Sequence, residues 1–411
     1  MNWRSYDPKK DKDAYYRIWR EVGWLRKEKE KEAMMNSYIE CGRALVAEIN
    51  GEAECIVNSA PGTINYLNEK LTFSGVTGAT TSRIARKRGL ATRLMAQLVA
   101  EDAKEGIQVC GLGMFEQGFY NRIGFGTGSY VNKFKFDPST INVTKKARIP
   151  KRITTDDWEN AHNARLNRLS RHGACHFLPP VVTQVQMHWA NNGFGLGYED
   201  DNKRLTHYFW GGSENVERGP YYLSWIVFQN WEQFLELMAV LKSLGDQVRL
   251  VRMEEPPGIQ LQDLLQTPFK YRQITKGSNL ESNIQGYAYW QVRMCDLQGC
   301  LAKTHLKGEE EVRFNLKLTD PIEQYLNKDT EWQGLSGEYI ITLSSSSEAE
   351  KGKNQSLPTL KASVGAFTRM WLGICPATGL AATDELLGSP DLLKKLDWVL
   401  RLPVPRLDWE F

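Results

Sequence analysis

The chain has 411 residues, of which 41% are hydrophobic and 25% charged, a balance typical of a soluble globular protein with roughly two to three domains. Its formal net charge of +3 is nearly neutral for this length and gives no support for a nucleic-acid or membrane partner. The first residues lack the apolar core of a signal peptide, and no apolar run approaches the ~20 residues of a membrane-spanning helix. We therefore expect a cytoplasmic protein.

The seven cysteines are scattered without a CxxC pair, which favours free thiols in a reducing compartment. The six histidines show no metal-ligand spacing with them, so we expect no metal cofactor. His172 and His176 flank Cys175. We interpret this cluster as a helix end near a turn, with metal binding as the less favoured alternative.

The chain opens with two predicted helices and a hairpin. Apolar residues at helical spacing predict a helix over residues 12–25, and the charged run at 28–32 predicts the solvated start of a second one. Strand patterns at 43–49 and 54–58 flank Asn50-Gly51, the dipeptide favoured in two-residue hairpin turns.

A strand, a basic loop, a helix and a second strand follow. Residues 71–81 are strand-like, the apolar stripe over 89–104 predicts a helix, and 107–112 is a predicted buried strand. After a short tyrosine-containing helix, we expect a last strand at 131–136. This order indicates a mixed α/β domain over residues 1–137.

Residues 138–290 repeat parts of that order as a structural echo without a sequence repeat. The predicted elements are a helix at 156–170, strands at 194–199, 204–211 and 221–228, a helix at 231–244 and a strand at 247–253. Where a phosphate loop would stand, this domain has Gln229-Asn230-Trp231-Glu232, with neither glycine nor a basic residue. We therefore expect no phosphate-binding site in it.

The third part, residues 291–411, is predicted to be an α+β domain. Apolar residues alternate along two strands, around 312–318 and 339–343. The polar stretch 344–356 is predicted to be a mobile loop, and Ser389-Pro390 to start a helix that ends near Leu396.

The basic residues before the helix at 89–104 carry the strongest chemical signal. Arg83, Arg86, Lys87 and Arg88 crowd the start of this helix, and acidic residues collect at its end. A helix start carries a partial positive charge, so each misplaced exposed charge costs about 0.3–1 kcal/mol. An anion bound at the helix start would explain the arrangement, and Gly89 would let the backbone approach it.

Other interpretations of this basic segment are alternatives to an anion site. A solvated basic turn before an ordinary amphipathic helix is the simplest alternative, since short motifs match by chance. A nucleotide P-loop is excluded because no GxxxxGK[ST] sequence occurs, and a dinucleotide GxGxxG sequence is also absent. A strand before and a helix after the loop favour the anion site.

Two motifs resemble a known family. Arg86, Gly89 and Ala91 match the signature of the GNAT superfamily of N-acetyltransferases, whose loop amides hold the pyrophosphate of coenzyme A. Residues 118–126, GFYNRIGFG, resemble a stretch of the Eis-type (enhanced intracellular survival) acetyltransferases. The resemblance covers the whole chain. It implies tandem GNAT domains, a catalytic one over 1–137 and a degenerate one over 138–290, and a C-terminal domain similar to sterol carrier proteins over 291–411.

The resemblance also implies roles for particular residues. The backbone at Ala79 and Thr81 would pair with the pantetheine arm of acetyl-CoA, Tyr120 would be the general acid, and the terminal carboxylate of Phe411 the general base. Glu410 would line the amine pocket. The pyrophosphate would be held by Arg86, Lys87, Arg88, Gly89, Leu90 and Ala91. Phe115 and Gly78 depart from the family pattern, which puts the substrate preference in doubt.

General chemistry agrees in part with these roles. An alkylamine with a pKa of about 10.4 is only ~0.1% neutral at pH 7, so attack on a thioester needs a proton acceptor, and a tyrosine can protonate the departing thiolate. A terminal carboxylate needs burial or a water relay to act as the base. The alternative role for Trp409 and Phe411 is to pin the tail into the core of the third domain.

The expected partner is a small-molecule or lysine-like amine, with aminoglycosides, polyamines and peptide lysines all compatible. The resemblance implies a homo-hexamer. The alternative function is a non-catalytic binder of acetyl-CoA or an apolar ligand, in which the third domain would carry the ligand. The residues that could line such a pocket are Phe367, Met370, Trp371, Leu372 and Ile374, which are more often plain core.

Overall fold

The computed structural model describes residues 2–25, 29–308 and 310–410. The chain forms two compact units. The first unit contains residues 1–129, 171–179 and 288–411, and the second contains 130–170 and 180–287. None of the helices formed by these described residues is long and apolar enough to cross a membrane.

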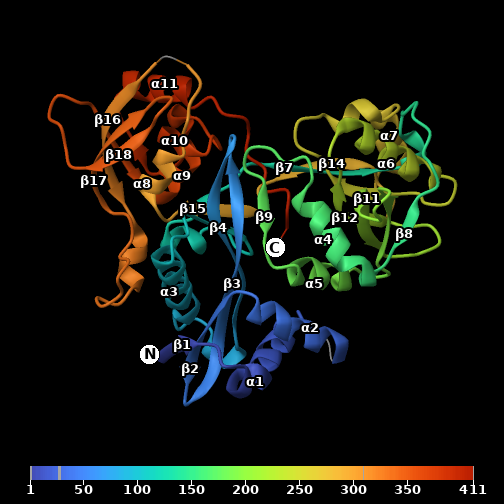
Figure 1. Cartoon of the computed structure of the whole chain (residues 1–411), viewed down its shortest axis with the longest axis horizontal. Coiled ribbons are helices and arrows are strands. Elements are labelled where there is room, and N and C mark those ends of the chain that lie inside the picture. Colours follow the sequence, from blue (N-terminus) through green and yellow to red (C-terminus); the bar gives the residue numbers. More distant parts are fainter. Residues whose placement is uncertain (1, 26–28, 309, 411) are drawn as a thin grey trace. The chain divides into compact units, whose positions relative to one another are not determined.

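The first unit is built on an eight-stranded sheet in the order β1-β2-β3-β4-β5-β15-β6, with β9 paired to β3 (Figure 1). Its strands are β1 Asn2–Ser5, β2 Arg43–Ile49, β3 Glu52–Tyr66, β4 Glu69–Thr81, β5 Val109–Gly113, β6 Gly126–Thr127, β9 Cys175–Phe177 and β15 Trp290–Met294. The predicted Asn50-Gly51 turn is confirmed, with positive φ values of 54° and 86°. Such a turn matches the twist of the two strands that it joins.

Helices cover both faces of this sheet. They are α1 Pro8–Glu21, α2 Lys29–Glu40 and α3 Leu90–Lys104. The predicted helix at 89–104 is confirmed, with Gly89 as its N-cap. Ser74 of β4 donates to Asp102 of α3, whereas Tyr38 of α2 bonds to Thr77 of β4. Because successive side chains of a strand alternate between faces, α2 and α3 lie on opposite sides of the sheet.

A second sheet of the first unit has five strands in the order β18-β17-β16-β19-β20. Its strands are β16 Val312–Thr319, β17 Gly337–Leu343, β18 Glu348–Lys351, β19 Thr359–Ser363 and β20 Leu386–Leu387, and the helices beside it are α8 Leu297–Ala302, α9 Val364–Trp371, α10 Ala377–Thr383 and α11 Pro390–Val399. The prediction of a mobile loop over 344–356 was wrong. This stretch contains β18, whose backbone pairs with β17 although its side chains are polar.

Four of the five residues considered for an apolar ligand pocket belong to the core, and Ile374 is half-buried. Phe367, Met370, Trp371 and Leu372 are all nearly inaccessible to solvent. Trp371 stacks on Tyr66 with ring centroids 4.5 Å apart. Its indole Nε1 donates to Thr304 Oγ1 at 2.8 Å. This packing favours the interpretation that these side chains are ordinary core residues and do not line a ligand pocket.

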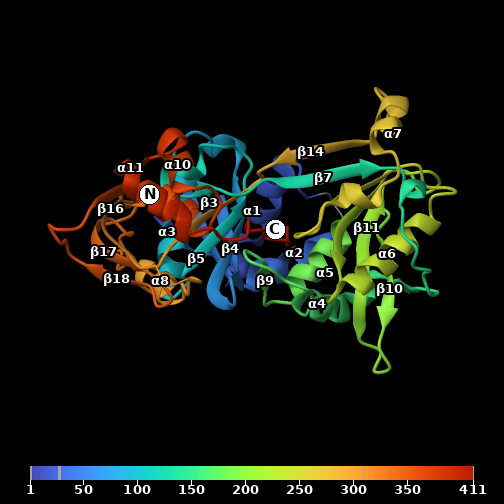
Figure 2. The same ribbon diagram turned by 90° about the horizontal axis from the view of Figure 1, so that it is seen from above.

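The second unit has a seven-stranded sheet in the order β14-β7-β13-β12-β11-β10-β8 (Figure 2). Its strands are β7 Val131–Phe136, β8 Lys151–Ile153, β10 Phe194–Glu199, β11 Leu205–Ser213, β12 Tyr221–Val227, β13 Val251–Glu254 and β14 Asn283–Tyr287, and its helices are α4 Trp158–Leu166, α5 Val181–Trp189, α6 Trp231–Ser243 and α7 Pro268–Thr275. The strand at 131–136 was predicted to end the first domain. It pairs with β13 and β14 instead, because β15 takes the place beside β5.

The predicted echo of the first sheet in the second is confirmed at the level of topology. In the first sheet β2, β3 and β4 are antiparallel, and α3 then connects β4 to the parallel strand β5. In the second sheet β10, β11 and β12 are antiparallel, and α6 connects β12 to the parallel strand β13. Both units therefore contain the same crossover, in which a helix connects an antiparallel strand to a parallel one.

Candidate active site

The site begins where β4 and β5 separate. Their parallel pairing ends at Val76–Leu112. β4 continues to Thr81 through its pairing with β3, whereas β5 ends at Gly113. Over the described residues, no pair joins β4 to β5 beyond Val76, so one edge of the end of β4 has no partner from β5. An open strand edge can bind a ligand that carries peptide-like amides.

A bulge in β4 shapes this edge. The register of β3 with β4 shifts between Ile56 and Asn58. Gly78 lies at the shift with φ of +63°, and a methyl group there would lie 2.1 Å from Asn58 Oδ1. Glycine is therefore required at a position where the sequence suggested only a changed substrate pocket. Beyond the bulge, Ala79 and Thr81 are half-buried, and bulges of this kind redirect the residues that follow them.

The basic loop is anchored at both ends. Ala85 and Leu90 are buried in one core cluster with the side of α3 that faces the sheet. Between them Arg86, Lys87, Arg88 and Gly89 are exposed. Gly89 has φ of +73°, and an added methyl group there would meet no atom within 4 Å. The loop thus presents three basic side chains and open space at the start of α3.

The start of α3 also lacks the usual side-chain cap. Gly89 provides no side-chain cap, and the first turn contains no acidic residue. The first backbone N–H groups of a helix have no partner within the helix and attract an anion. Ala91, in the first turn, is half-buried. The arrangement suits a polyanion bound over Gly89.

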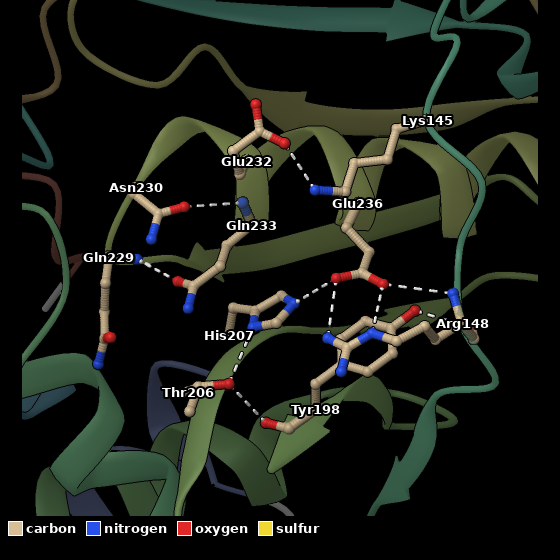
Figure 3. Close-up of polar contacts among 10 residues, drawn as sticks. All are labelled: Lys145, Arg148, Tyr198, Thr206, His207, Gln229, Asn230, Glu232, Gln233 and Glu236. Carbon is tan, nitrogen blue, oxygen red and sulfur yellow. Dashed lines mark hydrogen bonds and ion pairs between the residues drawn. The ribbon is translucent and has the colours of Figure 1, made fainter. Parts of the chain in front are cut away.

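The corresponding helix of the second unit is capped by its own residues (Figure 3). Asn230 Oδ1 accepts from the backbone N–H of Gln233 at 3.0 Å, and Gln233 Oε1 accepts from the N–H of Gln229 at 2.7 Å. Glu232 adds a negative charge to the first turn of α6. The start of α6 is therefore already capped and acidic. This is in line with the expectation that the domain has no phosphate site.

Sequence patterns did not reveal two further residues beside the loop. Glu21 Oε2, at the end of α1, accepts from the backbone N–H of Arg83 at 2.7 Å. The Oγ atom of Ser82 is buried without a hydrogen-bond partner in the part of the chain that the structure describes. Glu21 lies far from the loop in the sequence, so only the fold brings them together. A buried hydroxyl without a partner beside an anion site is a candidate donor to the ligand.

Tyr120 lies on the α3 side of the sheet. It begins the short 3₁₀ helix Tyr120–Ile123 and packs in the same core cluster as Leu90. Its side chain is 8% exposed, and burial raises the pKa of its phenol although the backbone of Phe115 hydrogen-bonds to it. A phenol with a raised pKa stays protonated at neutral pH and can act as a proton donor.

Gly124 fixes the turn that follows Tyr120. It has φ of +82°, and a methyl group there would lie 2.5 Å from Val364 Cγ1 and 2.9 Å from Arg293 Nη1. The glycine at position 124 therefore has a local packing reason beside its family resemblance.

The C-terminal tail lies along β9, at the edge of the first sheet (Figure 1). Leu407 O accepts from the backbone N–H of Cys175 at 2.9 Å. Trp409 is 2% exposed and meets Phe177 edge-on at 5.6 Å. Trp409 therefore packs against Phe177 of β9, in the first sheet. Glu410 is exposed, and Phe411 lies outside the described residues.

The histidine and cysteine cluster is part of the same arrangement. Residues 175–177 form strand β9, so the predicted helix end was wrong. The reason is that both edges of this segment find backbone partners, in β3 and in the tail. No group of His, Cys, Asp or Glu among the described residues could hold a metal ion.

The features at the end of β4 together fit coenzyme A. An open strand edge suits the amides of a pantetheine arm, and the uncapped, basic start of α3 suits a pyrophosphate. The buried Ser82 hydroxyl adds an unused donor at the same place.

Comparison with known proteins agrees with this fit. The model of the acetyltransferase (GNAT) domain family matches residues 4–128. No curated protein gives a match.

Solved structures match the whole chain at low sequence identity. A probable N-acyltransferase from Enterococcus faecalis has a TM-score of 0.81 at 16% identity, covering 100% of this chain and 99% of its own. A GCN5-related N-acetyltransferase from Anabaena variabilis has a TM-score of 0.78 at 13% identity, with 100% of both chains covered. Eis1 from Mycobacterium abscessus has a TM-score of 0.76 at 15% identity, again with 100% of both chains covered.

At these identities the structural matches establish a shared fold for the full length, while the domain match concerns the part that holds the basic loop and Tyr120. The chain is therefore an acetyltransferase with a GNAT domain over residues 4–128, built as a whole on the fold of Eis1.

Proposed function

We propose that this protein transfers the acetyl group of acetyl-CoA to a primary amine by direct attack of the amine on the thioester. One observation carries the proposal: β4 parts from β5 immediately before an uncapped, basic helix start. The pyrophosphate would bind at Arg86, Lys87, Arg88, Gly89, Leu90 and Ala91, and the pantetheine arm along the backbone of Ala79 and Thr81. The thioester would then lie between the separating strands.

In the proposed reaction the amine nitrogen bonds to the acetyl carbon, and the carbon–sulfur bond breaks. Tyr120 gives its phenolic proton to the departing thiolate of coenzyme A. The terminal carboxylate of Phe411, directly or through a water, takes the proton that the amine loses. Such paired proton transfers each contribute about 10²–10⁴-fold to a rate.

The two faces of β4 support this division of roles. Ser74 faces α3, the side on which Tyr120 packs. Phe73, the preceding residue, faces the other side, where its ring lies 6.0 Å from that of Phe177. Phe177 in turn contacts Trp409. The acid and the chain terminus would thus approach the thioester from opposite faces.

The proposed acceptors are aminoglycosides, polyamines and lysine-like amines, which share a protonated amine at neutral pH. Glu410, exposed and next to the chain terminus, would attract such a cation. We propose no metal and no nucleic-acid or membrane partner.

The family resemblance supports further proposals about organisation. We propose that residues 138–290 are a degenerate GNAT domain, that 291–411 resemble a sterol carrier protein, and that the protein is a cytoplasmic homo-hexamer. Sedimentation of the purified chain tests the assembly, because a single monomeric species would remove the hexamer.

Release of coenzyme A from acetyl-CoA, measured against a panel of polyamines, aminoglycosides and lysine peptides, tests the activity. We expect turnover in the parent and losses of about 10²-fold or more in kcat in Tyr120→Phe and in the chain lacking Phe411. Acetyl-CoA binding, measured by calorimetry, should be retained in both variants.

Matched variants separate the proton-transfer roles from packing. Tyr130→Phe changes an exposed tyrosine and should be silent. Phe411→Ala keeps a terminal carboxylate, whereas an added glycine moves that carboxylate. We expect Phe411→Ala to retain more activity than the extended chain. Binding of acetyl-CoA without turnover on any amine would favour the non-catalytic alternative.

A further inference from the structure

Strand β9 is held between two partners, and one of them is β3. Asn65 N donates to Ala174 O at 2.9 Å, and Gly173 N donates to Asn65 O at 2.8 Å. Leu178 N donates to Pro61 O at 3.1 Å. Residues 171–179 therefore extend the first sheet along the part of β3 that lies beyond its pairing with β2.

The opposite edge of this segment holds the C-terminal tail. Cys175 donates from its backbone N–H to Leu407 O at 2.9 Å and from Sγ to the same oxygen at 3.2 Å. Arg406 N donates to His172 O at 3.2 Å. These contacts hold the tail residues in a path with no regular secondary structure of their own, which includes a positive φ of 48° at Asp408.

The tail packs tightly against Gly173. This residue has φ of +84°, and a methyl group there would lie 2.6 Å from both Arg406 N and Pro405 Cβ. Ser129 Oγ donates to Pro405 O. The close approach of the two backbones depends on the absence of a side chain at Gly173.

The segment itself is anchored in the core of the first unit through His172. Its Nδ1 accepts from Leu67 N at 3.0 Å, and its Nε2 donates to Leu372 O at 2.9 Å. The ring also meets Tyr66 edge-on at 5.2 Å. With both ring nitrogens engaged, the residue beside Gly173 has one defined position.

We propose that residues 172–175 are a clamp that positions the C-terminal tail, and with it the terminal carboxylate, for the proton transfer. This inference rests on the proposed function. Chain ends usually fray, yet Trp409 is almost completely buried. The two residues that follow Trp409 in the sequence can span at most about 7 Å. A fixed Trp409 therefore limits how far the terminal carboxylate can reach. Gly173 and Cys175 are positioning residues, not catalytic ones.

The test compares two glycines that share a backbone conformation. Gly173→Ala adds a methyl group against the tail, whereas Gly51→Ala adds one at φ of +86° with no atom within 4 Å. We expect Gly173→Ala to lower kcat by about tenfold or more, because small misplacements of reacting groups are costly. Gly51→Ala should leave kcat unchanged, and KM for acetyl-CoA should stay the same in both. Equal kcat values in the two variants would overturn the clamp.

The pH profile separates positioning from general damage. An amine needs the base less as it becomes neutral on its own, so the loss in Gly173→Ala should shrink as pH rises from 7 to 9.5. Cys175→Val removes the thiol donor with little change in volume and should show the same trend with a loss of about two- to fivefold. A loss independent of pH in both variants would argue for damage to the fold and against the clamp.

Removal of Phe411 distinguishes this inference from the proposed function. If the truncated chain turns over like the parent, the base role of the terminus fails, and the clamp as a catalytic device fails with it. If truncation is harmful but Gly173→Ala is not, the clamp alone fails. If both are harmful, the double variant should lose no more than the truncation. Carboxypeptidase should also release the last residues faster from Gly173→Ala than from Gly51→Ala, and equal release rates would overturn the clamp.

Discussion

The carboxylate of Glu21 accepts a hydrogen bond from the backbone N–H of Arg83, with 2.7 Å between Oε2 and N. This contact ties the end of α1 to the loop that begins the proposed coenzyme A site. Glu21 also lies 3.7 Å from Arg17. The loop conformation therefore depends on a helix from the start of the chain.

Replacing Glu21 with alanine should loosen the loop. A hydrogen bond to a charged group contributes about 1.5–3 kcal/mol. The contribution here is smaller because water screens the half-exposed carboxylate of Glu21. We expect KM for acetyl-CoA to rise about fivefold with kcat unchanged. Glu52→Ala is the control, because Glu52 also pairs with Arg17 at 3.7 Å but does not contact the loop. Equal KM values for the two variants would contradict the role of Glu21.

Removing a basic side chain from the loop should weaken cofactor binding through the pyrophosphate. We expect Arg86→Ala to raise the Kd for acetyl-CoA about five- to twentyfold at low salt and less at high salt. Turnover with S-acetyl-pantetheine, which lacks the pyrophosphate, should be unaffected. Lys70→Ala, at the opposite end of β4, controls for net charge. An equal loss with both acyl donors would show that Arg86 does not act on the pyrophosphate.

In the pH profile of kcat, the alkaline limb, where activity falls as pH rises, should be centred above the ordinary pKa of tyrosine. Burial raises the pKa of Tyr120 above 10.0, so the phenol keeps its proton as pH rises through 10. Activity that needs this proton is present below the folded-state pKa and is lost above it. Incorporation of 3-fluorotyrosine at this position should move the limb to lower pH. A parent limb centred below pH 10, unmoved by fluorination, would exclude Tyr120 as the donor.

The joint between the two sheets of the first unit should depend on a buried ion pair. Arg293 Nη2 and Asp320 Oδ2 lie 2.7 Å apart, and both side chains are fully buried. Removing one partner of such a pair costs about 3–5 kcal/mol because the other charge stays buried. We expect Asp320→Asn to lower the urea midpoint strongly and Arg293→Met with Asp320→Asn to recover part of the loss. Glu69→Gln, which breaks an exposed pair with Lys303, should change little.

Acid should weaken the second unit through Glu236, shown in Figure 3. Hydrogen bonds from Arg148, and then from His207, hold its pKa at about 2, below the ordinary 4.5. Its contribution to stability is therefore complete above pH 4.5 and is lost as pH falls towards 2. Thermal unfolding between pH 7 and 3 should show a smaller acid-side fall of Tm in Glu236→Gln than in the parent. Glu232→Gln, an exposed neighbour on α6, should follow the parent.

The sequence by itself determined the local elements and the chemistry of the loop. The strand at 43–49, the Asn50-Gly51 turn and the helix after Gly89 follow from periodicity and turn preference, which act between near neighbours. The reversed charge of α3 and the lack of glycine and basic residues at the start of α6 were both readable because they involve residues within one turn.

Only the tertiary structure decided which strands share a sheet and where the tail goes. β7 pairs in the second sheet and β15 in the first, and each choice depends on backbone partners more than 100 residues away in the sequence. Long-range contacts also bring Glu21 to Arg83, 62 residues away in the sequence, and Cys175 to Leu407, 232 residues away. Backbone hydrogen bonds carry no side-chain signature, so a polar segment such as 348–351 can form a strand wherever an edge is open to it.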